Sequence, residues 1–127
     1  MKIAALISRI LLGLMFVVFG ANGLHPFLPV PQMQPGPARD FVMALFQSHY
    51  TVVIFAVQLI GGILLLVNRY VPLALTFLGA VIVNIDCYHL FMDRAGLPRA
   101  AFVTILWFVL FYYHRRSFAG ILEHRPI

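Results

Sequence analysis

Four apolar stretches alternate with short polar connections along the chain, and each approaches the length of a membrane-spanning helix. The stretches cover residues 3–24, 50–67, 72–92 and 97–113. Pro72 and Pro98 each fall in the first turn of a stretch, where a proline costs the helix no hydrogen bond. The pattern therefore predicts a single all-α transmembrane domain over residues 1–127, an integral membrane four-helix bundle.

The long connection between the first two stretches is predicted to begin as an extended segment. Residues 25–37 contain five prolines, a density that prevents a helix and favours an outer strap across the bundle mouth. From Ala38 to Gln47 the helical spacing of apolar residues returns, which predicts a short interfacial helix in the headgroup plane. The connections at residues 68–70 and 93–96 are tight, so neighbouring helices should run antiparallel.

Composition favours a membrane protein over a nucleic-acid-binding one. The chain is 62% hydrophobic and 10% charged, whereas soluble domains average about 45–50% and about 25%. The formal net charge of +5 comes from basic residues at the ends of the stretches and in the connections, where membrane orientation requires them. The lipid bilayer is the expected partner, and no nucleic acid is expected.

The basic residues also predict which way the chain faces. An inner N-terminus puts six of them inside and three outside: Lys2, Arg9, Arg69, Arg115, Arg116 and Arg125 against Arg39, Arg94 and Arg99. Because positive charge collects on the cytoplasmic side, both termini should lie inside. The first stretch could instead be a cleaved signal peptide, but its length and the arginine within it favour a retained span.

Polar residues inside the stretches share helix faces with glycines. Arg9 lies on the face of Gly13 in the first stretch, Gln58 lies beside Gly61 in the second, and the third carries Gly79 on the face of its acidic residue. Small residues allow helices to approach closely. We expect these three faces to meet in the bundle interior.

The stretch VNIDCYHLFMD, residues 83–93, concentrates polar side chains at the end of the third apolar segment. Asp86 and His89 are three residues apart and should share one face with Asp93. An acid inside the hydrocarbon normally faces a partner or a wet cavity, and an acid beside an imidazole sets its tautomer and raises its basicity. Asp86 and His89 are therefore the candidate catalytic residues. The candidate substrate-binding residues are Arg9, Asn22, Gln58 and Asn84.

These residues also have simpler interpretations. Gln58 and Asn84 can tie helices together through interhelical hydrogen bonds, and Arg9 can extend its charged head to the inner interface. The single cysteine, Cys87, excludes an internal disulfide and a C-x-x-C redox pair.

The histidines and the polar residues of the apolar stretches could in principle bind three kinds of cofactor: a metal ion, a haem or a quinone. A metal would need His25, His49, His89 and Asp86 to converge from separate loops, so no metal site is predicted. A haem would need two facing histidines, for which only His49 and His89 could serve. A lipid-soluble quinone needs only a donor, an apolar cleft and a proton route, and the series Arg9, Gln58 and Asp86 with His89 could supply the route.

Three segments carry a resemblance to a known family: SRILLGLMFVVFGANGL at 8–24, FAVQLIGGILLLVNRYVPLAL at 55–75 and VNIDCYHLFMDRAGLPRA at 83–100. Over nearly its whole length the chain resembles the DoxX family of small four-span bacterial membrane proteins. The family pattern matches Asn84 and His89, has Glu where this chain has Gln58, and does not include Asp86. The resemblance implies a multi-pass protein of the bacterial plasma (inner) membrane, with relatives that include a subunit of an archaeal thiosulfate:quinone oxidoreductase.

Three functions are compatible with these features. The first is a quinone-linked membrane redox protein or the small membrane subunit of an oxidoreductase. Its cofactor stays unknown: a quinone is compatible with these residues, and haem is disfavoured. The alternative is a non-catalytic accessory or assembly protein that binds a partner membrane complex. A small carrier or channel would need an oligomer, since four spans leave little room for alternating access.

Overall fold

The chain is mostly helical in a computed structural model that describes residues 1–28 and 32–124, with Leu122 described through its backbone alone. The described residues contain no strand. The helices are α1 (Lys2–Leu24), α2 (Pro37–Gln47), α3 (Tyr50–Leu66), α4 (Val71–Phe91), η1 (Arg94–Gly96), α5 (Leu97–Tyr113) and η2 (Arg115–Leu122). The fold is all-α, as the sequence predicts.

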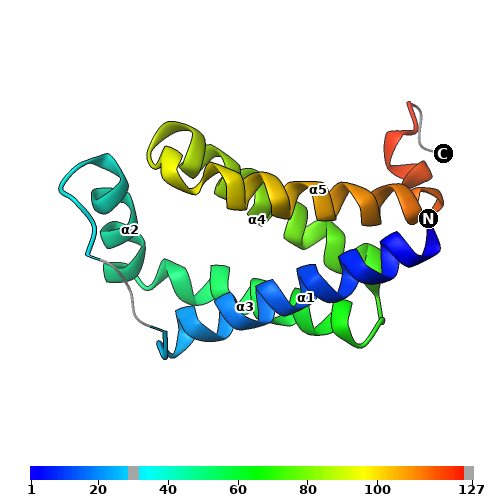
Figure 1. Cartoon of the computed structure of the whole chain (residues 1–127), viewed down its shortest axis with the longest axis horizontal. Helices are drawn as coiled ribbons and strands as arrows, with labels where there is room; N and C mark the ends of the chain where they lie inside the picture. The colour runs from blue at the N-terminus through cyan, green and yellow to red at the C-terminus, as the bar shows by residue number, and fades with distance from the viewer. Residues whose placement is uncertain (29–31, 125–127) are drawn as a thin grey trace.

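Four long helices form the body of the molecule. α1 packs along α3, α4 packs along α5, and the two pairs meet where α1 contacts α5 and α3 contacts α4. Figure 1 shows the two pairs side by side, with α2 at one end and the N-terminus and η2 at the other. α2 is bent by 88° from α3, so it lies across the end of the bundle.

Glycines set the close approach of α1 and α3. A Cβ on Gly62 would lie 2.8 Å from the Val17 nitrogen and 2.9 Å from the Gly13 oxygen. A Cβ on Gly20 would lie 2.8 Å from the Leu59 nitrogen. Backbone therefore packs against backbone here, which only small residues permit, and the prediction that the glycine-bearing faces meet inside the bundle is confirmed for these two helices.

The most deeply buried large side chains of the core are leucines, and one partly buried indole packs against them. Leu12, Leu65, Leu75, Leu78 and Leu110 are the large side chains with essentially no exposed surface. The Trp107 indole nitrogen donates to the Leu75 carbonyl across the α4–α5 contact at 2.8 Å. Gly79 leaves room for that ring, because a Cβ there would lie 3.1 Å from it.

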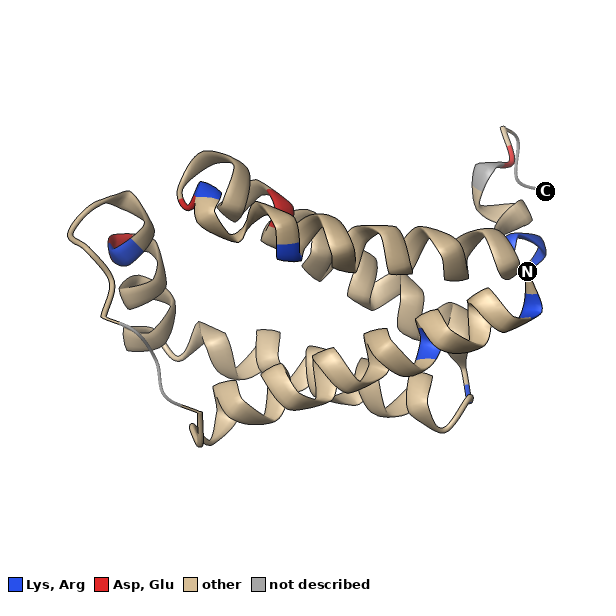
Figure 2. Cartoon of the chain, in the orientation of Figure 1, with Lys and Arg blue, Asp and Glu red and all other residues tan. Residues whose placement is uncertain are grey.

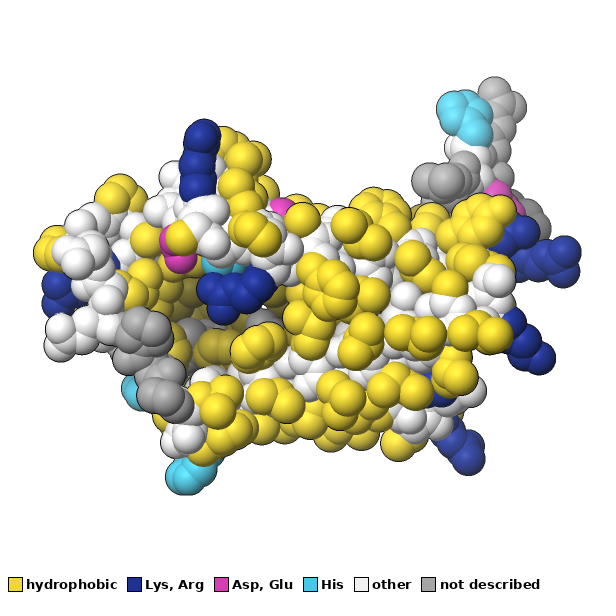
Figure 3. Space-filling model, in the orientation of Figure 1, with side chains coloured by type: hydrophobic (Ala, Val, Ile, Leu, Met, Phe, Trp, Pro, Cys, Tyr) yellow, Lys and Arg dark blue, Asp and Glu magenta, His cyan; other side chains and the backbone are white. Residues whose placement is uncertain are grey.

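The outside of the bundle is apolar. Val53 is 64% exposed, Ile60 is 59% exposed and Ile105 is 60% exposed, and Figure 3 shows hydrophobic side chains over most of the visible surface. In the described part of the chain, α1, α4 and the η1–α5 segment are long and apolar enough to cross a membrane. The bent α2–α3 pair gives a fourth crossing if it is taken as one span. Exposed apolar surface on this scale is typical of a membrane protein.

The expected helix ends agree with the observed ones to within two residues. α2 begins at Pro37, one residue before the expected start, because Gly36 at φ 152 turns the chain into the helix in a conformation that favours glycine. Residues 29–31 of the predicted strap, and Arg125, lie outside the described residues. The short helix η2 was not predicted from the sequence pattern.

Candidate functional site

A cavity of about 860 Å³ opens at the end of the bundle where α2 lies. Its walls come from α1, α3, α4, the start of α5 and the segment of residues 32–38. Figure 3 shows the surface hollowed between the lower pair of helices and α5. Its volume falls within the range of small-molecule and cofactor sites in proteins.

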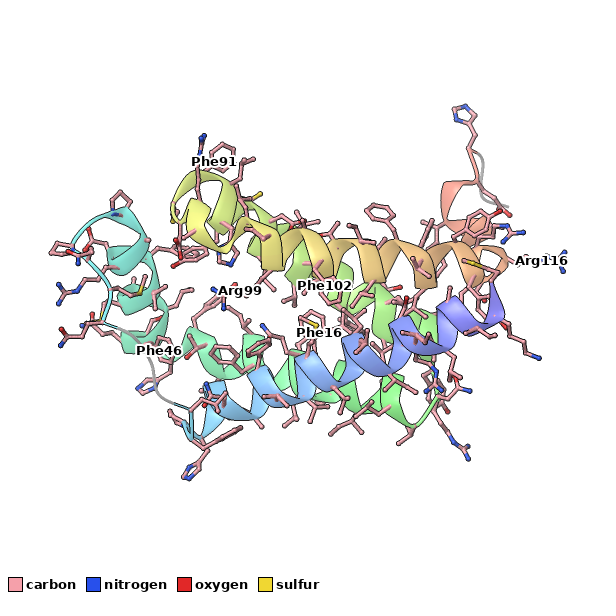
Figure 4. The ribbon with its side chains drawn as sticks, viewed as in Figure 1. Phe16, Phe46, Phe91, Arg99, Phe102 and Arg116 are labelled. Atoms are coloured by element: carbon pink, nitrogen blue, oxygen red, sulfur yellow. The ribbon has the colours of Figure 1, made fainter. Side chains whose placement is uncertain are left out.

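The walls of the cavity are mostly apolar. Figure 4 shows Phe16 pointing from α1 toward the space between the two helix pairs, and its side chain is 3% exposed. Across the cavity, α4 and α5 contribute Ile85 and Val103, while α3 contributes Phe55. An apolar body, such as a ring or the first part of a lipid tail, would bury its surface against these side chains.

Gln58 is the polar group deepest in the cavity. It is 6% exposed, lies eight residues into α3, about 12 Å along the helix axis, and lines the cavity. No hydrogen bond joins its side chain to another described residue, yet within residues 1–28 and 32–124 every fully enclosed side-chain nitrogen or oxygen has a partner. The Gln58 amide therefore keeps its remaining surface open to the cavity, where it offers one acceptor and two donor hydrogens.

His89 lines the same cavity with a fixed tautomer. Its Nδ1 lies 3.1 Å from the Asp93 carbonyl oxygen, and since a carbonyl can only accept, Nδ1 carries the hydrogen. In the neutral ring Nε2 then keeps its lone pair for a ligand. The ring is held by the edge of Tyr88, with ring centroids 5.0 Å apart, and by Gly96, where any Cβ would overlap the imidazole.

Opposite charges stand at the mouth of the cavity. Arg99 comes from the first turn of α5, and Figure 4 shows it pointing toward the gap between the helix pairs. Asp93 also lines the cavity. The Phe41 ring of α2 stacks on Tyr88 of α4 at 5.9 Å between centroids, so α2 closes the outer side of the site.

The structure gives Asp86 and His89 different hydrogen-bond partners. The Thr104 hydroxyl of α5 lies 2.8 Å and 3.0 Å from the two Asp86 carboxylate oxygens and 2.8 Å from the Ala100 carbonyl. Asp86 is not among the residues that line the cavity. The predicted Asp86–His89 pair is replaced by an α4–α5 contact, because Thr104 supplies a donor at the depth of the acid.

Three of the candidate substrate-binding residues also have structural partners away from the cavity. Arg9 Nη1 donates to the Leu65 carbonyl at 2.5 Å and to the Leu66 carbonyl at 3.2 Å. These are end carbonyls of α3, which lack partners within the helix. Arg9 thus lies at the end of α3 remote from the cavity, and the expected polar series from Arg9 through Gln58 to His89 is not continuous.

The two asparagines bond locally. Asn22 Oδ1 accepts hydrogen bonds from the Phe27 and Leu28 backbone nitrogens, both at 2.9 Å, and so holds the turn that follows α1. Asn84 is exposed on α4 and donates to the Ala80 carbonyl of its own helix at 2.8 Å. Of the six candidate residues, only Gln58 and His89 line the cavity.

Arg99, Tyr88 and Thr104 were not predicted as site residues. In the sequence Arg99 contributes only to the charge balance that predicts orientation, although its position one residue after Pro98 places it in the first turn of a helix. Thr104 is the single aliphatic hydroxyl in the stretch 97–113, a signal that points to an interhelical bond but not to its partner.

No group of three or more His, Cys, Asp or Glu side chains within residues 1–28 and 32–124 could hold a metal ion. His25 and His49 are both exposed. Comparison with known protein families, with curated proteins and with solved structures finds no match to this chain.

Proposed function

We propose that the chain is a four-span protein of the bacterial plasma membrane, with both termini on the cytoplasmic side and α2 in the outer headgroup plane. The end of the bundle that holds the N-terminus and η2 carries Lys2, Arg69, Arg115 and Arg116. At the other end, Arg39, Arg94 and Arg99 are accompanied by Asp40 and Asp93 (Figure 2). The excess of positive charge at the terminal end supports this orientation.

The cavity is the proposed binding site for the head of a lipid-soluble quinone. The observation that carries this proposal is the pairing of apolar walls with two open polar groups, the Gln58 amide and the His89 imidazole. A quinone has an apolar ring with a carbonyl oxygen at each end. The Gln58 amide can donate to one oxygen, and His89 can accept a proton from the other when the ligand is a quinol.

The biological role proposed is that of a quinone-binding subunit of a membrane oxidoreductase. The electron-transferring group would belong to a partner subunit, and this chain would orient the quinone head and exchange its proton at His89. The resemblance of residues 8–24, 55–75 and 83–100 to the DoxX family supports the same class of ligand, and membership of that family is part of the proposal.

Quinone binding to the purified protein in lipid nanodiscs tests the proposal. We expect saturable binding of a short-tailed benzoquinone, weakened at least about fivefold by Gln58→Leu or by His89→Phe, since each removes a hydrogen bond worth roughly 1 kcal/mol or more. Leucine nearly keeps the volume of glutamine, so the apolar packing is preserved.

The chain offers matched controls for both substitutions. Asn84→Leu makes the same amide-to-leucine change away from the cavity, and His25→Phe makes the same ring change at an exposed position. Both should bind quinone like the parent chain. Absence of saturable binding, or equal weakening by the cavity variants and their controls, would overturn the proposal and leave the accessory role.

A further inference from the structure

α4 is the long helix that carries polar side chains on its outer surface away from the ends. In the described residues of α1, α3 and α5, the exposed side chains outside the terminal turns are all apolar. On α4, Thr76, Asn84 and Cys87 are exposed. At 100° per residue these three lie within one arc of the helix surface together with Ala80.

Asn84 is the residue that makes this face unusual. It lies three residues past the midpoint of α4, about 5 Å from it along the axis, and so deep in the hydrocarbon of the proposed membrane placement. One hydrogen of the Asn84 amide is donated to the Ala80 carbonyl. Its Oδ1 accepts no hydrogen bond from the described residues, and lipid tails offer no donor, so a partner helix would lower its energy.

We propose that this face of α4 is the interface of a homodimer in which Asn84 of one copy pairs with Asn84 of the other. The proposal rests on the membrane placement above and not on the ligand of the cavity. Two copies inserted the same way are related by a two-fold axis along the membrane normal, so each presents Asn84 at the same depth. Because the amide is both donor and acceptor, two such groups complement each other.

The neighbouring side chains suit this contact. Ala80 and Thr76 are small, and the Thr76 hydroxyl is already bonded to the Pro72 carbonyl at 2.9 Å, so it needs no partner across the interface. Small residues one turn apart let two helices approach closely. His89 lies about 140° from Asn84 around α4, so dimerisation leaves the cavity uncovered.

Cys87 provides the test, because it is the single cysteine of the chain, is exposed and lies one turn from Asn84 on the same face. In native membranes a thiol oxidant or a short bis-maleimide should join two chains into a product of twice the chain mass. Asn84→Leu should lower the yield about three- to tenfold, the range expected for one interhelical hydrogen bond. Ala80→Trp, which fills the contact, should also lower it.

Two controls separate an interface from chance collision. Gln58→Leu changes an amide inside the cavity and should leave the yield unchanged. Cys87→Ser combined with Ile60→Cys moves the thiol to the exposed face of α3 and should give no dimer.

The homodimer is overturned if the parent chain gives no dimer, if Asn84→Leu or Ile60→Cys gives the parent yield, or if the product has the mass of a different partner. Quinone binding by a chain that does not cross-link would reject the dimer alone. Cross-linking by a chain that binds no quinone would reject the proposed function alone.

Discussion

Two amide side chains, Gln58 and Asn84, lie within apolar stretches of the sequence. In the structure Gln58 is buried inside the bundle and Asn84 is exposed on its outer surface. Gln58 points inward because Gly61 and Gly62 on the neighbouring positions bring α3 against α4 and α1, which leaves its side chain at the cavity. Asn84 points outward on α4 and bonds to its own helix. Helical spacing alone places both near the middle of a span, and only the packing of the neighbouring helices shows which one can meet a ligand.

Arg9 is predicted to stabilise the fold without contributing to ligand binding. Arg9→Met removes the hydrogen bonds to the Leu65 and Leu66 carbonyls, and bonds from a charged donor contribute roughly 1.5–3 kcal/mol. Unfolding by denaturant in mild detergent should show a loss of about that size, while the affinity for quinone stays within about twofold of the parent value.

Arg69→Met is the matched control, since Arg69 is exposed at the same end of the bundle. A large loss of quinone affinity in Arg9→Met, with unchanged stability, would restore the alternative in which Arg9 is part of a polar route to the site.

The limits of sequence reasoning are clearest for Asp86 and Asn22. An acid in a membrane-spanning stretch predicts a polar partner, and that much holds, but the partner is Thr104 from another helix and not the nearby His89. Asn22 was a candidate for substrate binding because of its position near the outer end of a span. Its acceptor is used by two backbone nitrogens of the following turn, a local bond that hydropathy does not reveal.

At the scale of elements, the α1–α3 contact should be the least tolerant of added volume. Gly62→Val would push a side chain into the Val17 nitrogen and the Gly13 oxygen. Because backbone cannot move aside as a side chain can, we expect a loss of about 1–3 kcal/mol in the free energy of unfolding, as overpacked cores show.

Gly120→Val is the control for this substitution, since a Cβ on Gly120 meets nothing closer than Glu123 Oε1 at 3.8 Å. Equal stability of the two variants in denaturant titrations would show that α1 and α3 do not pack through these glycines.

The end of α5 should make stability depend on pH. Burial, and to a lesser degree the nearby Arg9 guanidinium, lower the pKa of His114 below its usual value of 6.5. Just below pH 6.5 the unfolded chain therefore binds a proton that the folded chain does not, so stability should fall as the pH is lowered through this window. The unfolding midpoint measured between pH 7.5 and pH 5 should show this decline.

His114→Gln should flatten that profile, because glutamine does not titrate. If the variant keeps the slope of the parent chain, the decline comes from other groups and the assignment to His114 is wrong.

Helix positions were the most predictable part of this protein. The long helices follow the apolar stretches because burial and membrane length both demand about 17–25 consecutive apolar residues, and prolines mark their starts. The bend between α2 and α3 was harder to predict from the sequence, because His49 adopts a left-handed conformation at φ 63 and no nearby glycine indicates it.

At the scale of the whole molecule, the cavity exists because α2 and residues 32–38 close the end of a bundle whose two helix pairs diverge (Figure 1). No single stretch of sequence encodes it. Gln58 and His89 are 31 positions apart in the chain, and their shared cavity follows from the pairing of α3 with α4. The sequence pattern places Gln58 and His89 among six candidate polar residues, and the fold determines that these two share a cavity.

The central claim is that this cavity holds the head of a quinone, and photolabelling measures it most directly. An azido-benzoquinone with an isoprenoid tail, activated by light in nanodiscs, should attach to peptides that contain Phe55 and Met92, on facing walls of the cavity. Excess unlabelled quinone should abolish the labelling, and Gln58→Leu should reduce it severalfold. Labelling confined to outward-facing residues such as Val53 and Ile60, unaffected by excess quinone, would contradict the account.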